Sequence, residues 1–298
     1  MSSQPLSAPR SLAPSERLAL TCTRAGACCH GNAVWLNPWE LARLAVALEL
    51  PPAAFRDRYT ELGGIRLAFD GPVVAAWGAA CRLYGGAALG CRAHAARPLA
   101  CRLYPLARAR AGDAVAYGFA GRGATALPCH ATCPEVAALP ELTVGDYLAE
   151  QGVAAGEEAQ DAYLAVVEAL ADGAFVLLFD SGLAATGDRA TLRGWRALGA
   201  ASAEARLDAI PAEWRDRLAV PGVDPALIAT PSAFVAAHEA LIQAAAQAAF
   251  ARLDSAAALS AASTLMMALA LHLGRAVGAD PAALSARWTA RARELGAR

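Results

Sequence analysis

Lysine is absent from this chain of 298 residues, and all 26 of its basic residues are arginine. This absence excludes Schiff-base catalysis by lysine and the lysine of a phosphate-binding loop. An excess of charge of one sign is also missing, because the formal net charge is −1. Such a chain has no broad field to attract nucleic acid or an anionic membrane, so we expect neither as a partner.

A secretory leader is a further absence. Residues 1–17 mix Ser, Pro, Gln and Arg without an apolar segment, so we predict a cytoplasmic protein whose thiols stay reduced. One long uncharged run, residues 255–274, consists largely of alanine, leucine and serine. Because alanine and serine contribute little to membrane insertion, we expect this run to be a buried helix and not a membrane span.

The order of residue types along the chain indicates three parts. Of all residues, 56% are hydrophobic and 18% are charged, which is typical of a folded protein. We predict a flexible tail at residues 1–17, a cysteine-cluster metal-binding module at 18–140 and a helical C-terminal region at 141–298. The module carries both helix and strand signals, whereas the last region is rich in alanine. The predicted fold class is therefore α+β, a small metal-tied module followed by a mostly α-helical bundle.

Local signals predict individual elements. Asn37, Pro38 and Glu40 form the pattern of a capping box with proline at the first helical position, so a helix should begin there. A second short helix should follow the two prolines at positions 51 and 52 and reach residue 62. Helical segments of the last region are expected near residues 157–172, 189–200, 202–219, 231–253, 255–275 and 281–296.

Two β-hairpins are predicted within the cysteine module. Residues 65–69 alternate in polarity, and Asp70-Gly71 is a turn signal that leads into residues 73–75. A second hairpin is expected around Gly112-Asp113, with residues 114–119 as the returning strand. Small strands and loops of this kind need an additional constraint, which a bound metal would supply.

All eight cysteines lie in the first 133 positions. Thiolates are soft ligands that suit zinc or iron–sulfur clusters, and such sites collect ligands from several loops with short spacing inside each group. The groups here begin at Cys22, Cys81 and Cys129 and have such spacing. We therefore predict metal ligands among all eight: Cys22, Cys28, Cys29, Cys81, Cys91, Cys101, Cys129 and Cys133.

The adjacent pair Cys28-Cys29 bears on the type of metal. Neighbouring side chains rarely reach one small ion together, so the pair indicates a larger cluster, two sites, or one ligand beside a structural thiol. We favour an iron–sulfur cluster over zinc for this reason. Buried cysteines without metal are the alternative, which explains the grouping poorly. The glycine-rich stretch 85–90 should form a loop that lets Cys81 and Cys91 converge.

Other polar residues near the cysteines have two interpretations. His30, His94 and His130 each lie close to a cysteine in sequence and could bind the same metal, although a hydrogen-bonding or surface role is the commoner one for each. Two further histidines, at positions 238 and 272, are expected to be structural. The arginines and the tyrosine around Cys101 could offset thiolate charge or clamp an anion, or hold the ligand loop, and we favour the structural role. These last residues are Arg97, Arg102 and Tyr104.

The cysteine motifs resemble those of a known family. The opening motif is Cys22-x5-Cys28-Cys29, and the closing motif runs from Arg97-Pro98 through Cys101-Arg102 to Tyr104-Pro105. Together with Leu36-x3-Glu40 and the cysteines at 81 and 91, they resemble the YkgJ-type cysteine-cluster family over roughly residues 20–135. The resemblance implies a zinc- or iron-chelating domain. Because the family includes flagellin lysine N-methylases, it also implies an iron–sulfur cluster, S-adenosylmethionine as a candidate cofactor and a protein as a candidate substrate.

Ala25 departs from the family pattern Cys-x2-Cys-Gly-x-Cys-Cys, because it stands in place of the second cysteine. Either this position is dispensable or another residue supplies the ligand, with Cys129, Cys133 and the three nearby histidines as candidates. Two functions stay open. A metal with an open position would suit a protein-modifying enzyme that resembles the lysine N-methylases, whereas a closed ligand set would suit a non-enzymatic binding module with a structural zinc or iron–sulfur site.

Overall fold

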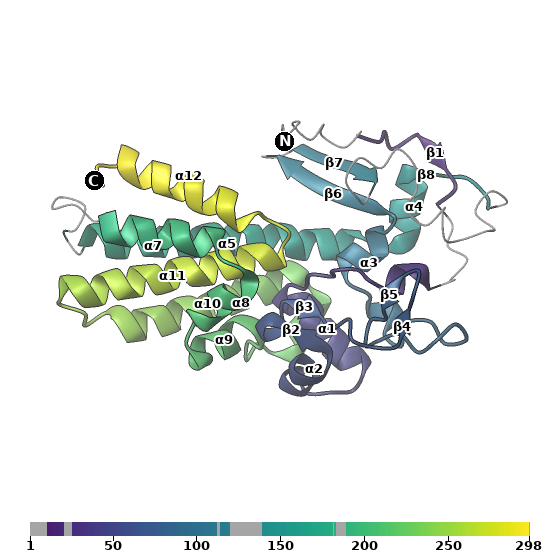
Figure 1. Cartoon of the computed structure of the whole chain (residues 1–298), viewed down its shortest axis with the longest axis horizontal. Coiled ribbons are helices and arrows are strands. Elements are labelled where there is room, and N and C mark those ends of the chain that lie inside the picture. Colours follow the sequence, from purple (N-terminus) through teal and green to yellow (C-terminus); the bar gives the residue numbers. More distant parts are fainter. Residues whose placement is uncertain are drawn as a thin grey trace. The chain divides into compact units, whose positions relative to one another are not determined.

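The computed structural model describes residues 11–20, 26–111, 114–119, 139–180, 182 and 189–297. Small strand pairs precede a series of helices (Figure 1), so the predicted α+β class with a helical C-terminal part is confirmed. The chain divides into two compact units, Met1–Val34 with Ala68–Glu157 and Trp35–Leu67 with Glu158–Arg298. The expected boundary near residue 140 stays a prediction, and the compact units divide the chain differently because residues 35–67 pack with the later helices.

The described residues of the first unit form three antiparallel strand pairs and two short α-helices. In one pair, β6 (Leu106–Ala111) runs against β7 (Ala114–Phe119), with Leu106 opposite Phe119. These are the strands expected on either side of Gly112-Asp113, which lie outside the described residues. The other elements are β1 (Arg17–Leu18) with β8 (Leu142–Thr143), β4 (Val73–Val74) with β5 (Gly78–Ala79), α3 (Leu99–Leu103) and α4 (Val144–Gln151).

The second unit begins with α1 (Pro38–Ala47) and α2 (Pro52–Tyr59). The predicted capping box is confirmed, because the Asn37 side chain accepts from the Glu40 amide at 2.9 Å and the Glu40 carboxylate accepts from the Asn37 amide at 3.1 Å. Such a box satisfies two of the amide donors that every helix start leaves open. Helix α2 ends at Tyr59, which is earlier than the predicted end at residue 62.

The predicted hairpin of residues 65–69 with 73–75 is wrong. Strand β3 (Arg66–Leu67) pairs with the preceding strand, β2 (Thr60–Glu61), and β4 pairs with the following strand, β5. Gly63 at φ +70° turns the chain one strand earlier than expected, in a conformation that glycine adopts readily. Pro72 has no amide donor for the ladder that the prediction required.

Most helices of the last region match the predicted segments, but the helix predicted at 157–172 runs from residue 154 to 180. The predicted break at Asp172-Gly173 is wrong, because Gly173 stays helical and packs closely against Met266. One predicted helix, 202–219, is divided into α8 (Ala203–Asp208) and α9 (Ala212–Ala219), because Pro211 lacks the amide that a continuous helix needs. The remaining elements are α5 (Ala154–Asp180), α7 (Arg189–Ala200), the 3-10 helix η6 (Pro225–Ala229), α10 (Pro231–Phe250), α11 (Ala256–Ala276) and α12 (Pro281–Glu294).

Helix α11 lies at the centre of the second unit's core. It packs against α7, α8 and α12, and its last three turns are almost entirely buried. Helices α5 and α11 are both long and apolar enough to cross a membrane, by length and composition alone. In this fold, 56% of the most apolar window of α11 is buried, which is the packing expected of the run at residues 255–274.

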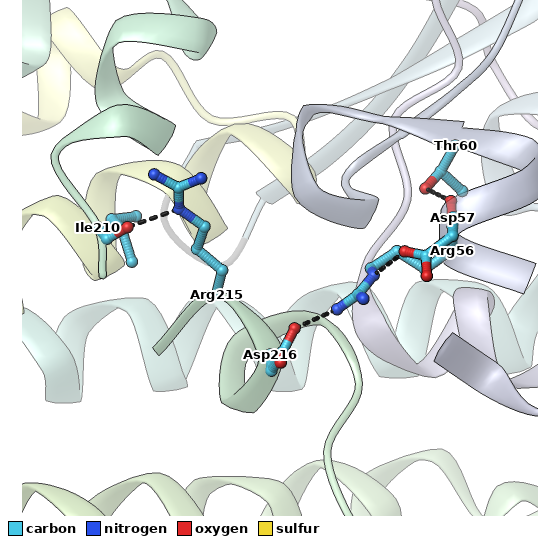
Figure 2. A network of polar contacts seen from close by, with 6 residues as sticks. All are labelled: Arg56, Asp57, Thr60, Ile210, Arg215 and Asp216. Atoms are coloured by element: carbon cyan, nitrogen blue, oxygen red, sulfur yellow. Dashed lines mark hydrogen bonds and ion pairs between the residues drawn. The ribbon is translucent and has the colours of Figure 1, made fainter. Parts of the chain in front are cut away.

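Polar contacts tie the early helices of the second unit to the later ones. Arg56 of α2 donates to Asp57 at 2.8 Å and also forms an ion pair with Asp216 of α9 (Figure 2). Arg215, the neighbour of Asp216, instead donates to the Ile210 carbonyl at 2.6 Å, and Figure 2 shows its guanidinium turned away from Arg56. Asp216 thus joins α9 to α2, whereas Arg215 binds the backbone just before α9.

Two histidines in the second unit are buried and neutral. His238 Nε2 lies 2.9 Å from the Arg217 carbonyl, which only accepts, so Nε2 carries the proton and Nδ1 accepts from the Tyr163 hydroxyl at 2.9 Å. His272 Nε2 donates in the same way to the Leu62 carbonyl at 3.1 Å. Burial lowers the pKa of both histidines to about 4. Both side chains are part of the core, as the structural interpretation predicted.

The buried histidines predict a loss of stability in acid. Between pH 6.5 and 4 the unfolded chain binds protons at these residues while the folded chain does not, so stability should decrease as pH falls through this range. At pH 5 one such histidine should account for about 2 kcal/mol. Urea unfolding at pH 7 and pH 5 should show a smaller pH difference in His238→Gln than in the wild-type protein. An identical difference in both proteins would contradict this origin of the acid sensitivity.

Candidate metal centre

The adjacent cysteines lie on a single turn of 3-10 helix. This turn, η1 (Ala27–Cys29), begins after Gly26, whose φ is +80°. A Cβ at Gly26 would lie 2.5 Å from the Tyr84 hydroxyl, so the position requires glycine both for its backbone conformation and for the approach of the tyrosine ring. The Asn32 side chain donates to the Cys28 carbonyl at 2.7 Å and holds the end of the turn.

The segment before Cys81 runs beside this turn. The Cys81 amide donates to the Cys29 carbonyl at 2.7 Å, and the Gly31 amide donates to the Ala79 carbonyl at 2.9 Å. Between these bonds, His30 forms an isolated antiparallel bridge with Ala80. The backbone thus brings the first and second cysteine groups together, although about 50 residues separate them in the sequence.

A tight loop returns the chain from Cys81 to Cys91. The Gly85 amide donates to the Gly90 carbonyl at 2.7 Å, and the Arg92 amide donates to the Leu83 carbonyl at 3.0 Å. An antiparallel bridge between Tyr84 and Cys91 closes the loop. The predicted convergence of Cys81 and Cys91 across the glycine-rich loop is confirmed.

The thiols are close enough to influence one another electrostatically. A hydrogen bond with Cys29, burial and the charge of Cys29 all raise the pKa of Cys28. Burial, with smaller contributions from Cys91 and Asp70, raises the pKa of Cys81 to about 11. The pKa of Cys91 is raised mainly by burial and also by Cys28. A set of partly buried thiols that disfavour one another's anions needs a cation before they can all be thiolates.

Arg97 is the positive group that acts on these thiols. Its charge lowers the pKa of Cys28 and of Cys91, in opposition to the larger effects that raise them. The guanidinium is held by the His94 carbonyl at 3.1 Å and by the Gln151 side chain at 3.0 Å. Arg97 therefore has both predicted roles, because it offsets thiolate charge and also fixes the loop before Cys101.

Arg102 has the structural role that was favoured. Its guanidinium donates to the carbonyls of Arg97 at 2.9 Å and Gln151 at 2.6 Å, so it joins the closing motif to the end of α4. The Tyr147 hydroxyl donates to the Tyr104 carbonyl at 2.6 Å and strengthens the same connection. These contacts hold the short helix that carries Cys101.

His30 is buried, with 6% of its surface exposed. Its Nδ1 lies 2.9 Å from the Gly26 carbonyl and donates to it, and its ring packs against Trp77 and Tyr84 at centroid distances of 5.5 and 5.1 Å. The predicted hydrogen-bonding role is thus present. A histidine whose Nδ1 donates to a backbone carbonyl also keeps Nε2 as its ligand nitrogen, so His30 stays a candidate. His94 is exposed on the 3-10 helix η3 (His94–Ala96).

The structure describes five of the eight predicted cysteine ligands. Cys81 is buried and the other four are partly buried, with Cys101 on α3. Cys22, Cys129 and Cys133 lie outside the described residues, as do Ala25 and His130. Within the described ranges, no group of three or more His, Cys, Asp or Glu side chains has an arrangement that could hold a metal ion. The full ligand set, including the replacement for the family cysteine at Ala25, stays a prediction.

Three residues of the site were not found from the sequence. Tyr84 and Trp77 enclose His30, and Gln151 binds both arginines of the closing motif. The sequence gave a weak signal for Tyr84, because a side chain three residues after a predicted ligand, Cys81, is expected to line the site. Gln151 gave none, since it lies about 50 residues from its partners.

The donor set fits a thiolate-bound metal. Four thiols from three segments, with an arginine beside them, present the soft ligands that zinc and iron prefer. The carboxylate of Asp70 also acts on Cys81, and it is engaged with Arg82. The first unit thus carries a thiol-rich module.

The comparison with protein families agrees with this description. Residues 21–134 match the CxxCxxCC family model, whose description is "Putative zinc- or iron-chelating domain". The match confirms the family resemblance of the cysteine motifs. Neither a curated protein nor a solved structure matches the chain significantly.

Proposed function

We propose that this protein binds iron or zinc through the cysteines of its first unit, and that an iron–sulfur cluster is the favoured form. One observation carries the proposal: the adjacent Cys28 and Cys29, Cys81 and Cys91 come from three segments of the chain and lie within electrostatic reach of one another. An ordinary core has no reason to place thiols in this way, whereas a thiolate site requires it.

The described residues have distinct parts in this proposal. The four cysteines would bind the metal, Arg97 would offset their negative charge, and the backbone bonds around His30 would hold the first two groups side by side. A bound metal would supply the positive charge that lets all four thiols ionise. Its binding free energy would also stabilise a unit whose strand pairs are short.

The preference for iron–sulfur is supported by the adjacent Cys28-Cys29 pair. Both side chains project from one turn of 3-10 helix and form a hydrogen bond with each other. Two neighbouring thiolates suit a site with more than one metal atom better than a single tetrahedral ion. A protein-modifying activity that uses S-adenosylmethionine on a protein substrate is supported by the family resemblance alone. We place the module in the reducing cytoplasm, where its thiols would stay free to bind metal.

Metal and sulfide analysis tests the proposal. Protein purified without oxygen should contain iron and acid-labile sulfide in stoichiometric amounts and should be brown, with broad visible absorption. Stoichiometric zinc in a colourless protein would overturn the preference for iron–sulfur but not the metal-binding function. Protein without metal, even after refolding with iron and sulfide or with zinc, would contradict the function itself.

A further inference from the structure

A group of arginines in the second unit has no part in the metal centre. The Arg275 guanidinium, at the end of α11, lies over the Trp35 indole at 4.0 Å from the ring centroid. Arg66 of β3 lies near the same ring at 5.8 Å. Two like charges therefore share one aromatic ring. Glu61 offsets the charge of Arg66, whereas the Arg275 guanidinium has no ion pair with a described residue, so an anion beside it would be favourable.

The Arg275 guanidinium makes no hydrogen bond or ion pair with any described residue. Its guanidinium is half-buried, and burial together with Arg66 lowers its pKa, against a smaller opposing effect of Asp280. Stacking on an indole fixes the plane of a guanidinium but uses none of its N–H donors. The donors at the edge of this group are therefore positioned, and no described residue uses them.

A third arginine near Arg275 has an unsatisfied donor. Arg206 of α8 is only 4% exposed, and its Nη1 donates to the carbonyls of Leu198 and Ala201 at the end of α7. Its Nε is buried and has no hydrogen-bond partner within the described part of the chain. Burial and the charge of Arg275 lower its pKa. A buried N–H without an acceptor typically costs about 1–3 kcal/mol, so a bound acceptor would recover free energy here.

The acids near these arginines already have partners. Glu61 accepts from Arg66 itself, Glu204 accepts from Ser202, and the Asp280 side chain caps α12 by accepting from the Ala282 amide at 3.0 Å. The exposed Glu204 and Asp280 also act on Arg206 through their charge. On the other side, buried His272 lies close enough to Arg206 and Arg215 that both contribute to its lowered pKa, and its Nδ1 has no partner among the described residues. The site therefore holds concentrated positive charge and unused donors, while its acids are already engaged.

We propose that Trp35, Arg66, Arg206 and Arg275 form a binding site for an oxyanion, a carboxylate or phosphate group of a small molecule. The stacked Arg275 would offer the planar fork of donors that such groups accept. The buried Arg206 Nε would gain the acceptor that it lacks. This binding site is independent of the metal and would give the helical unit a ligand of its own.

Calorimetric titration of the purified full-length protein with inorganic phosphate and with acetate, in chloride buffer of matched ionic strength, tests this proposal. We expect at least one anion to bind saturably, and Arg275→Gln to weaken it at least tenfold. Arg43→Gln is the matched control, because the half-buried Arg43 also lies over a tryptophan, Trp39 at 4.6 Å, and its guanidinium has no hydrogen bond to a described residue. It should bind like the wild type.

The two anions separate the two sources of the ligand group. Binding of phosphate alone would indicate a phosphorylated ligand, and binding of acetate alone a carboxylic acid. Circular dichroism and metal content should be unchanged in Arg275→Gln, and Arg275→Lys, which keeps the charge but loses the planar fork, should bind at an intermediate level. Absence of binding by both anions, or equal binding by Arg275→Gln and the wild type, would overturn the proposal.

Discussion

Replacing Cys81 by serine is expected to lower metal affinity by more than about 100-fold, because substitutions even of outer-shell partners typically cost 10- to 100-fold. Cys81 is the thiol at the junction of the site. Its amide binds the Cys29 carbonyl and its side chain lies near Cys91. Loss of this ligand should also lower the unfolding temperature of the metal-loaded protein, since metal-binding energy contributes to folding.

Metal content by elemental analysis and thermal unfolding with and without added metal would test this expectation. Ala76→Ser is the matched control, because it introduces the same side chain at an exposed position five residues earlier and removes no thiol. The wild type and Ala76→Ser should gain stability from metal, and Cys81→Ser should not. Full occupancy and normal stabilisation in Cys81→Ser would show that Cys81 is not a ligand.

Gly199→Ala is expected to destabilise the second unit by about 2–3 kcal/mol through overpacking. Gly199 lies near the end of α7, where this helix crosses the start of α12. A Cβ at this position would lie 1.9 Å from Ser285 Oγ, 2.5 Å from Ser285 Cβ and 2.9 Å from the Pro281 carbonyl oxygen. The serine side chain could rotate, but its Cβ and the proline backbone could move only if the helices separated.

Gly194→Ala, on the same helix, provides the control. A Cβ at Gly194 would have no atom within 4 Å, so this substitution should stabilise the protein by about 0.5–1 kcal/mol through helix propensity alone. Urea unfolding of both variants would measure the two effects with opposite signs. Adding Ser285→Gly to Gly199→Ala should recover part of the loss. If Gly199→Ala proves as stable as Gly194→Ala, the close approach of α7 and α12 is wrong.

The sequence alone determined the features that depend on neighbouring residues. Asn37 and Glu40 form their capping box because both partners lie within one helical turn. Helix α7 spans the residues predicted for it, and the 202–219 segment was misjudged only at Pro211, whose effect on the backbone is also local. The thiolate chemistry of residues 21–134 was equally evident, because it depends on residue type and spacing.

Only the tertiary structure decided which distant groups meet. Alternation at residues 65–69 showed that a strand was present, but its partner depended on the turn at Gly63, and the predicted hairpin was wrong. The contacts of Gln151 with Arg97 and Arg102 join segments about 50 residues apart and left no trace in local sequence. The pairing of Arg275 with Trp35 is of the same kind. Such contacts depend on how whole elements pack, and composition and periodicity describe each element only by itself.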